Sequence, residues 1–303
     1  MDASSVQNVV PKKLHRYKTR GNSVHPAKII IYILLALWAL TTVFPFIWVI
    51  INSFKQNSYI ISKSFEIPTS KMFTWENYQT AFSRINIVTA YKNSLLITAT
   101  VTVVAVILAG FAAYGLARYE FKGKQLLYSL VIASMMFPAF STIIPVFTME
   151  FDWHIVNTYS SLLSSLSVIL PQIAGSLSFA IIVLLGFIRS LPVDLEEAAY
   201  LEGYNVFQIF FKVVLFLIKP SLATVAIFTF LWSYNDLFTQ MFFLRYQNSY
   251  TITVLLNEIQ SIAGTNYGMM FSSVVLVVIP VLIVYIVLQK NIIKGLTAGA
   301  LKG

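Results

Sequence analysis

Residues 191–220, LPVDLEEAAYLEGYNVFQIFFKVVLFLIKP, form a polar, helix-prone segment between two long apolar runs. Asp194 is placed to cap a helix, Glu196 and Glu197 fall in its first turn, where the positive end of the dipole favours acids, and Gly203 is placed to end it. A helix of about eight residues is only about 12 Å long, too short to cross a membrane. It suits either the groove of a partner protein or a connector at a membrane surface, and the residues alone leave both open.

The composition indicates that the rest of the chain lies in a membrane. Of its 303 residues, 57% are hydrophobic and 11% are charged, whereas soluble domains carry roughly 25% charged residues. Six apolar runs are long enough to cross roughly 30 Å of hydrocarbon. They cover residues 28–52, 94–117, 126–149, 160–188, 213–234 and 269–289. The sequence therefore predicts an all-α integral membrane protein with six transmembrane helices and both termini on one side.

The placement of Lys and Arg predicts the orientation. With the N-terminus in the cytoplasm, 15 of the 21 Lys and Arg residues fall in cytoplasmic segments, as the positive-inside rule requires. The predicted organisation is a basic cytoplasmic tail, residues 1–27, followed by a six-span domain, residues 28–303. Within this domain, the loop 189–212 and the tail 290–303 are cytoplasmic.

The chain lacks the residue patterns of catalytic chemistry. Its three histidines, His15, His25 and His154, have no metal-ligand spacing, it has no cysteine, and it has no Gly-x-x-x-x-Gly-Lys-Ser/Thr phosphate loop. The net charge of +9 is spread over short segments that flank the membrane, which indicates topology and anionic lipid rather than nucleic acid. We therefore expect no catalytic residue and no metal site.

The segment quoted above resembles the cytoplasmic coupling loop of permease subunits of ABC-type importers. That family's motif is Glu-Ala-Ala, three variable residues, Gly, nine variable residues, then an aliphatic residue and a nearby Leu-Pro. The matching residues here are Glu197, Ala198, Ala199, Gly203, Val213 and Leu215. Phe216 replaces the Pro, and Pro220 follows four residues later, so we expect the helix bend after the motif one turn further along.

The C-terminal segment 289–303, QKNIIKGLTAGALKG, carries a second resemblance. It is similar to the closing segment of carbohydrate-type permeases, in particular the smaller permease subunit of maltose-type importers. In that family the tail reaches between two ATPase subunits. The residues that would do so here are Gly295, Leu296, Thr297, Ala298 and Gly299. On composition alone, a frayed tail of small residues is the alternative.

These resemblances cover nearly the whole chain and imply a type I ABC importer permease that takes up a sugar or oligosaccharide. They imply a homologous second permease, two ATPase subunits that bind ATP and Mg, an extracytoplasmic binding protein, and no cofactor on this chain. The implied ATPase contacts are Glu197, Ala198, Ala199, Tyr200, Leu201, Gly203 and Tyr204. An ion-driven carrier would need intramembrane carboxylates, and none lies in the middle of a predicted span. A membrane scaffold without transport is the third hypothesis.

Two further regions are candidates for the substrate pathway. Gln172 follows Pro171, which we expect to interrupt the fourth span, and its amide can both donate to and accept from sugar hydroxyls. The element at 232–238 resembles a Trp-Asn-Glu-Phe-like element of sugar permeases, with two extra residues. Its pathway candidates are Trp232, Tyr234, Asn235 and Asp236. An interfacial aromatic anchor and close helix packing are the open alternatives.

Two outside loops are predicted to contain short structured elements. The first, residues 54–93, is expected to form a short helix, and residues 251–260 form the second such element. By similarity, the loop before the last span carries part of the surface on which the binding protein docks. Simple connection is the alternative for both loops.

Overall fold

The computed structural model describes residues 26–156 and 158–300. This part of the chain is helical, and its only extended pairing is an isolated bridge between Lys55 and Phe73. The predicted tail 1–27 lies almost entirely outside the described residues. The elements in chain order are α1 (Pro26–Ser53), α2 (Asn57–Ser62), α3 (Glu76–Arg84), α4 (Ile87–Arg118), α5 (Lys124–Ser134), α6 (Ala139–Asp152), α7 (Ser161–Arg189), α8 (Asp194–Leu201), α9 (Val206–Ile209), the π-helix η1 (Phe210–Val214), α10 (Leu215–Leu217), α11 (Lys219–Asn235), α12 (Leu237–Phe243), the 3-10 helix η2 (Gln247–Ser249), α13 (Ile252–Ala263) and α14 (Tyr267–Ala300).

The chain divides into two units, Met1–Trp48 and Val49–Gly303. The described part of the first unit belongs to α1, and its side chains from Ile29 to Ile47 are exposed. The hydroxyls of Thr41 and Thr42 donate to the carbonyl of Trp38 at 2.8 and 2.9 Å. Because these two hydroxyls are bonded within the helix, this apolar stretch suits hydrocarbon surroundings.

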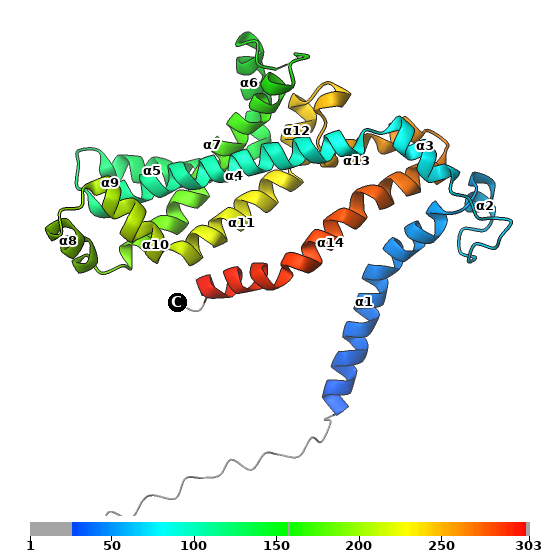
Figure 1. The fold of residues 1–303 in the computed structure, drawn as a ribbon, viewed down its shortest axis with the longest axis horizontal. Helices are drawn as coiled ribbons and strands as arrows, with labels where there is room; N and C mark the ends of the chain where they lie inside the picture. Colours follow the sequence, from blue (N-terminus) through cyan, green and yellow to red (C-terminus); the bar gives the residue numbers. More distant parts are fainter. Residues whose placement is uncertain (1–25, 157, 301–303) are drawn as a thin grey trace, which may run out of the picture. The chain divides into compact units, whose positions relative to one another are not determined.

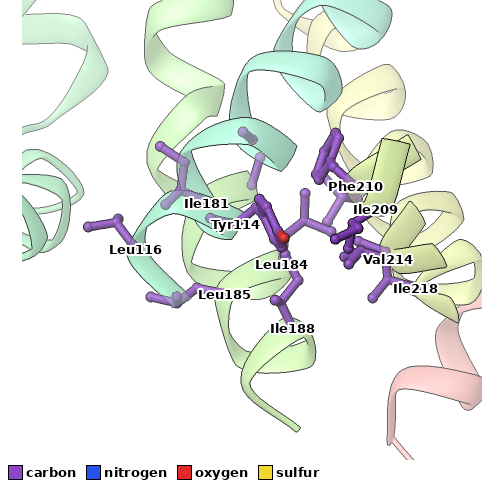
Figure 2. Close-up of a cluster of buried hydrophobic side chains, with 14 of the residues drawn as sticks. Tyr114, Leu116, Ile181, Leu184, Leu185, Ile188, Ile209, Phe210, Val214 and Ile218 are labelled. Carbon is purple, nitrogen blue, oxygen red and sulfur yellow. The ribbon is translucent and has the colours of Figure 1, made fainter. Parts of the chain in front are cut away.

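The second unit is built around α4, which packs along α7, with α11 against both (Figure 1). Five side chains on α4 recur every four residues and are fully buried, which places them on one face of the helix. They are Ile97, Val101, Ala105, Ala109 and Ala113. The three alanines allow the neighbouring helices to approach closely. At the C-terminal end of α4, side chains of α4, α7 and residues 209–218 meet in one apolar cluster (Figure 2).

Among the described helices, α1, α4 and α7 are long and apolar enough to cross a membrane. A fourth crossing is formed if residues 206–217 and 219–235, which are bent by 80° relative to one another, count as one span. The break falls at Ile218, and Pro220 lies in the first turn of α11, where its missing N–H is tolerated. The predicted bend is therefore confirmed, whereas a continuous helix over 213–234 is wrong. Pro171 does not interrupt α7, which runs through it from Ser161 to Arg189.

The predicted third span, 126–149, is wrong as a single helix. It consists of α5 and α6, with 11 and 14 residues, and neither reaches the roughly 20 residues that a crossing needs. Pro138 is extended, with φ −63° and ψ 128°, and a proline disfavours helical conformation in the residue before it. The predicted span 269–289 lies within α14, whose backbone runs from Tyr267 to Ala300. Because the third predicted span is broken, six crossings stay a prediction.

The two outside loops contain the predicted short elements. Residues 54–93 hold two short helices, α2 and α3, where one was expected, and α13 covers the predicted element at 251–260. Both α2 and α3 pack on α14, and α13 packs on α4 and α14. These segments therefore cluster near the N-terminal ends of α4 and α14, away from α8 (Figure 1).

Candidate functional site

The short helix α8 connects the end of α7 to α9 and lies at the C-terminal end of α4 (Figure 1). The predicted helix in this loop is confirmed, with Asp194, Glu196 and Glu197 in its first turn. The predicted cap is wrong: Val193 occupies the capping position without a side-chain hydrogen bond, since Asp194 is already the first helical residue. Gly203 follows the helix with φ +89°, a conformation that favours glycine and ends the helix as predicted.

The two faces of α8 have different surroundings. Glu196 and Ala199 are its only buried residues, and Ala199 joins the apolar cluster of Figure 2. Tyr200 and Leu201 are 68% and 87% exposed, and Glu197 is exposed without an ion pair or hydrogen bond among the described residues. The exposed side chains of α8 thus include two carboxylates, Asp194 and Glu197, together with Tyr200 and Leu201.

The remaining predicted contact residues divide between the two surroundings. Ala198 and Gly203 are exposed. Tyr204 is half-buried against the apolar cluster, and the Lys212 ammonium lies 4.9 Å from the centre of its ring. Tyr204 and Ala199 are therefore packed within this chain, whereas the other five predicted residues are accessible.

A hollow of about 560 Å³ lies beside α8. Its walls come from the C-terminal end of α4, from α8 and from α9, and they include Glu197, Tyr200 and Leu201. A concave surface that combines aromatic, aliphatic and acidic groups suits a side chain of a protein partner.

Glu196 links α8 to α4. From the sequence, it was expected only to interact favourably with the dipole of the short helix. Its Oε1 lies 2.6 Å from Nε of Arg118, and its Oε2 accepts a hydrogen bond of 3.0 Å from the hydroxyl of Tyr114. Arg118 also donates from Nη2 to the carbonyl of Leu191 at 3.1 Å. Glu196 and Ala199 are three residues apart, a spacing that could have indicated a shared inner face. No sequence pattern linked Glu196 to Arg118.

Two of the pathway candidates meet in a buried polar network. Gln172 is buried, its Nε2 donates to Oδ2 of Asp236 at 2.9 Å, and its Oε1 accepts from the hydroxyl of Ser233 at 2.6 Å. The other oxygen of Asp236 accepts from the Thr239 amide at 3.1 Å and caps α12. The carbonyl of Ser233 accepts from Nε2 of Gln240 at 2.7 Å. Both ends of the Gln172 amide are therefore bonded within the chain.

The other three pathway candidates point to separate surroundings. Trp232 is partly exposed, and its ring would lie 3.3 Å from a Cβ added to Gly175. Tyr234 is half-buried and stacks on Phe230 with ring centres 6.0 Å apart. Asn235 is exposed and donates to the carbonyl of Leu231 at 2.7 Å. The structure thus brings Gln172 and Asp236 together but does not gather all five residues.

The predicted tail contact lies at the limit of the described structure. The backbone of α14 continues through Gly295, Leu296, Thr297, Ala298 and Gly299 to Ala300. The side chains of these residues lie outside the described part of the chain.

A buried carboxylate on α6 was missed from the sequence because it directly follows the predicted third span. Glu150 is 1% exposed, and its Oε2 has no hydrogen-bond partner among the described groups. Burying a carboxylate without a compensating partner costs free energy.

Comparison with known proteins identifies the family. Residues 105–298 match the family model described as "binding-protein-dependent transport system inner membrane component". The diacetylchitobiose uptake system permease protein NgcG of Streptomyces coelicolor is 33% identical over 89% of this chain and 87% of its own length. The galactooligosaccharides transport system permease protein GanQ of Bacillus subtilis is 33% identical over 90% of this chain and 94% of its own length.

A solved structure shows the same fold. A chain of a bacterial ABC transporter involved in the import of the acidic polysaccharide alginate aligns with a TM-score of 0.71, 23% identity, and coverage of 86% of this chain and 95% of that chain. The resemblance to importer permeases drawn from the coupling segment and the C-terminal segment is thereby confirmed. The chain belongs to the family of binding-protein-dependent transport system inner membrane components.

Proposed function

We propose that this chain is a transmembrane permease subunit of an ATP-driven importer for a sugar or oligosaccharide. It forms half of the translocation pathway and couples that pathway to a separate ATPase subunit. The observation that carries the proposal is α8, whose inner face is fastened to the transmembrane bundle while Glu197, Tyr200 and Leu201 face outward. The relatives named for diacetylchitobiose and galactooligosaccharides support the substrate class.

The proposed topology has six crossings, with both termini and α8 in the cytoplasm. Besides α1, α4, α7 and the bent segment 206–235, the crossings are the broken pair α5–α6 and α14. The distribution of Lys and Arg supports this orientation. α8 is then the cytoplasmic coupling helix, on the side of the membrane where ATP is available.

The proposed assembly places the chemistry of ATP on other chains. A homologous second permease completes the pathway, and two ATPase subunits bind ATP and Mg. The C-terminal residues Gly295–Gly299 reach between these subunits. The family description, binding-protein-dependent transport, supports an extracytoplasmic binding protein, and we place part of its docking surface in the segment 236–268.

The mechanism follows from the way α8 is attached. ATP binding closes the ATPase dimer, and the exposed face of α8 moves with the ATPase subunit on which it is seated. Because the inner face of α8 is bonded to α4, which packs on α7 and α11, this movement changes which conformation of the bundle is favoured. Access to the pathway then switches from outside to inside.

We place Gln172, Trp232, Tyr234, Asn235 and Asp236 beside the substrate pathway. The support is the polar network that joins Gln172 on α7 to Asp236 at the end of α11. In the described conformation Ser233 and Asp236 occupy the Gln172 amide. A sugar hydroxyl therefore reaches this amide only in a conformation in which one of these hydrogen bonds has opened.

The proposal is tested by reconstitution. This chain, a candidate companion permease and a candidate ATPase are co-expressed and placed in lipid nanodiscs, and ATP hydrolysis is recorded with binding protein across an oligosaccharide panel. We expect hydrolysis to rise with binding protein loaded with one class of sugar and not with empty binding protein. Failure of the chain to associate stably with any ATPase would refute the proposal.

A further inference from the structure

We propose that Glu196 is a positioning residue for energy coupling: through Arg118 and Tyr114 it makes α8 and the end of α4 move as one body. This inference rests on the proposed role of α8 as the ATPase contact. The two adjacent carboxylates then have different roles. Glu197 contacts the ATPase subunit, whereas Glu196 passes the movement of α8 to α4.

The Arg118–Glu196 pair differs in kind from the other ion pairs in residues 26–156 and 158–300. Lys63–Glu66 and Lys124–Glu120 join neighbours three and four residues apart, and each carboxylate is mostly exposed. Exposed pairs of this type contribute little. Arg118 and Glu196 lie 78 residues apart, and both side chains are only 11% exposed. Removing one partner of such a pair leaves a charge without compensation in a poorly solvated place.

The link between α8 and α4 rests on Glu196, whereas the other packing of α8 is against α9 and η1. Of its eight residues only Glu196 and Ala199 are buried, and a single methyl group contributes about 1 kcal/mol of hydrophobic free energy. Both carboxylate oxygens of Glu196 are used, one by Arg118 and one by Tyr114. The contact between α8 and α4 is therefore made by directional polar interactions rather than by nonspecific apolar packing.

The α4 side of this contact is held firmly. The ring of Tyr114 packs against Phe210 and Tyr119, with centres 5.2 and 5.9 Å away. Phe210 also stacks on Phe111 at 4.7 Å. Arg118 additionally binds the carbonyl of Leu191, which precedes α8. A displacement of α8 is thus passed to α4 at two points, one in the helix and one just before it.

The test uses four variants of the assembled transporter, in proteoliposomes for uptake and in nanodiscs for the label. Glu196→Gln and Arg118→Gln each remove one charge, the double variant removes both, and Glu202→Gln removes an exposed carboxylate just after the end of α8. The measured quantity is sugar taken up per ATP hydrolysed, together with the amount of ATPase that copurifies. The chain has no cysteine, so a spin label on Glu202→Cys, at the exposed end of α8, reports the mobility of the helix alone.

We expect each single variant to lower uptake per ATP at least ten-fold, to increase the mobility of the label, and to keep the ATPase bound. The double variant should lose no more than either single variant, because each single change already breaks the one polar link between α8 and α4. Glu202→Gln should match the wild type. Lower uptake per ATP with the ATPase still bound and a more mobile label is a result that loss of folded protein alone does not produce.

The outcomes separate this inference from the proposed function. If the wild-type chain recruits no ATPase, the proposed function fails. If the ATPase binds and is stimulated but the single variants keep uptake per ATP, or if their losses multiply in the double variant, only the role of Glu196 is refuted. Should the single variants not assemble, Tyr114→Phe removes one hydrogen bond and keeps the ring. It must increase the mobility of the label, and unchanged mobility refutes the inference.

Discussion

Replacing Glu197 with Lys is expected to reduce sugar uptake at least 100-fold while the chain still inserts and folds. Glu197 is exposed on α8 and forms no ion pair within the described chain, so its reversal leaves the internal contacts of the subunit intact. In the proposed complex it faces a basic group of the ATPase, and like charges across an interface cost several kcal/mol. About 2.8 kcal/mol already corresponds to a 100-fold loss. Uptake and copurified ATPase are measured in the reconstituted complex.

Glu202→Lys is the matched control for this prediction. Glu202 is also exposed, lies five residues further on just after the end of α8, and undergoes the same change of charge. We expect uptake within two-fold of the wild type, because Glu202 lies outside the predicted contact face. Normal uptake in Glu197→Lys would count against the coupling role of α8, and equal losses in both variants would point to a general effect of charge.

Hydrophobic length predicted the long straight helices well. α1, α4 and α7 appear close to where apolar runs indicated them, although α4 begins seven residues earlier than its predicted span. The broken helices were predicted less well. An apolar run indicates that a segment lies in the membrane, but it does not indicate whether the helix there is continuous. Pro138 and Pro220 break helices through their effect on the backbone, which hydropathy does not record. Pro171 shows the limit of that rule, since α7 continues through it.

The candidate site was predictable only in its local part. The helix, its acidic first turn and the glycine that ends it follow from short-range rules. Glu196 is buried and Glu197 is exposed because only one face of α8 meets α4. The position of α4 relative to α8 cannot be predicted from the local sequence. The partners Arg118 and Asp236 are 78 and 64 residues from Glu196 and Gln172. Pairs at such separations are set by the packing of whole helices.

The second large effect concerns the end of the molecule opposite α8, where Gly268→Ala is expected to destabilise the chain severely. A Cβ at Gly268 would lie 2.3 Å from Oδ1 and 2.6 Å from Cγ of Asn77. Asn77 cannot turn away freely, because its Nδ2 donates to the carbonyls of Ser53 and Lys55 at 2.9 and 2.8 Å. Overpacking costs roughly 1–3 kcal/mol, and each buried carbonyl left without a donor costs about 1–3 kcal/mol more.

We expect the thermal unfolding midpoint of Gly268→Ala in nanodiscs to fall by about 5 °C or more, with a several-fold lower yield of inserted chain. Gly186→Ala is the matched control, because a Cβ there meets nothing within 4 Å and alanine favours a helix over glycine. Asn77→Ala supplies the decisive comparison. It removes the atoms with which the new methyl collides, so Gly268→Ala must cost less in that background than in the wild type. An equal cost in both backgrounds would show that the methyl is opposed by something other than Asn77. The packing of α3 against the start of α14 would then depend on a different contact from the one that this structure indicates.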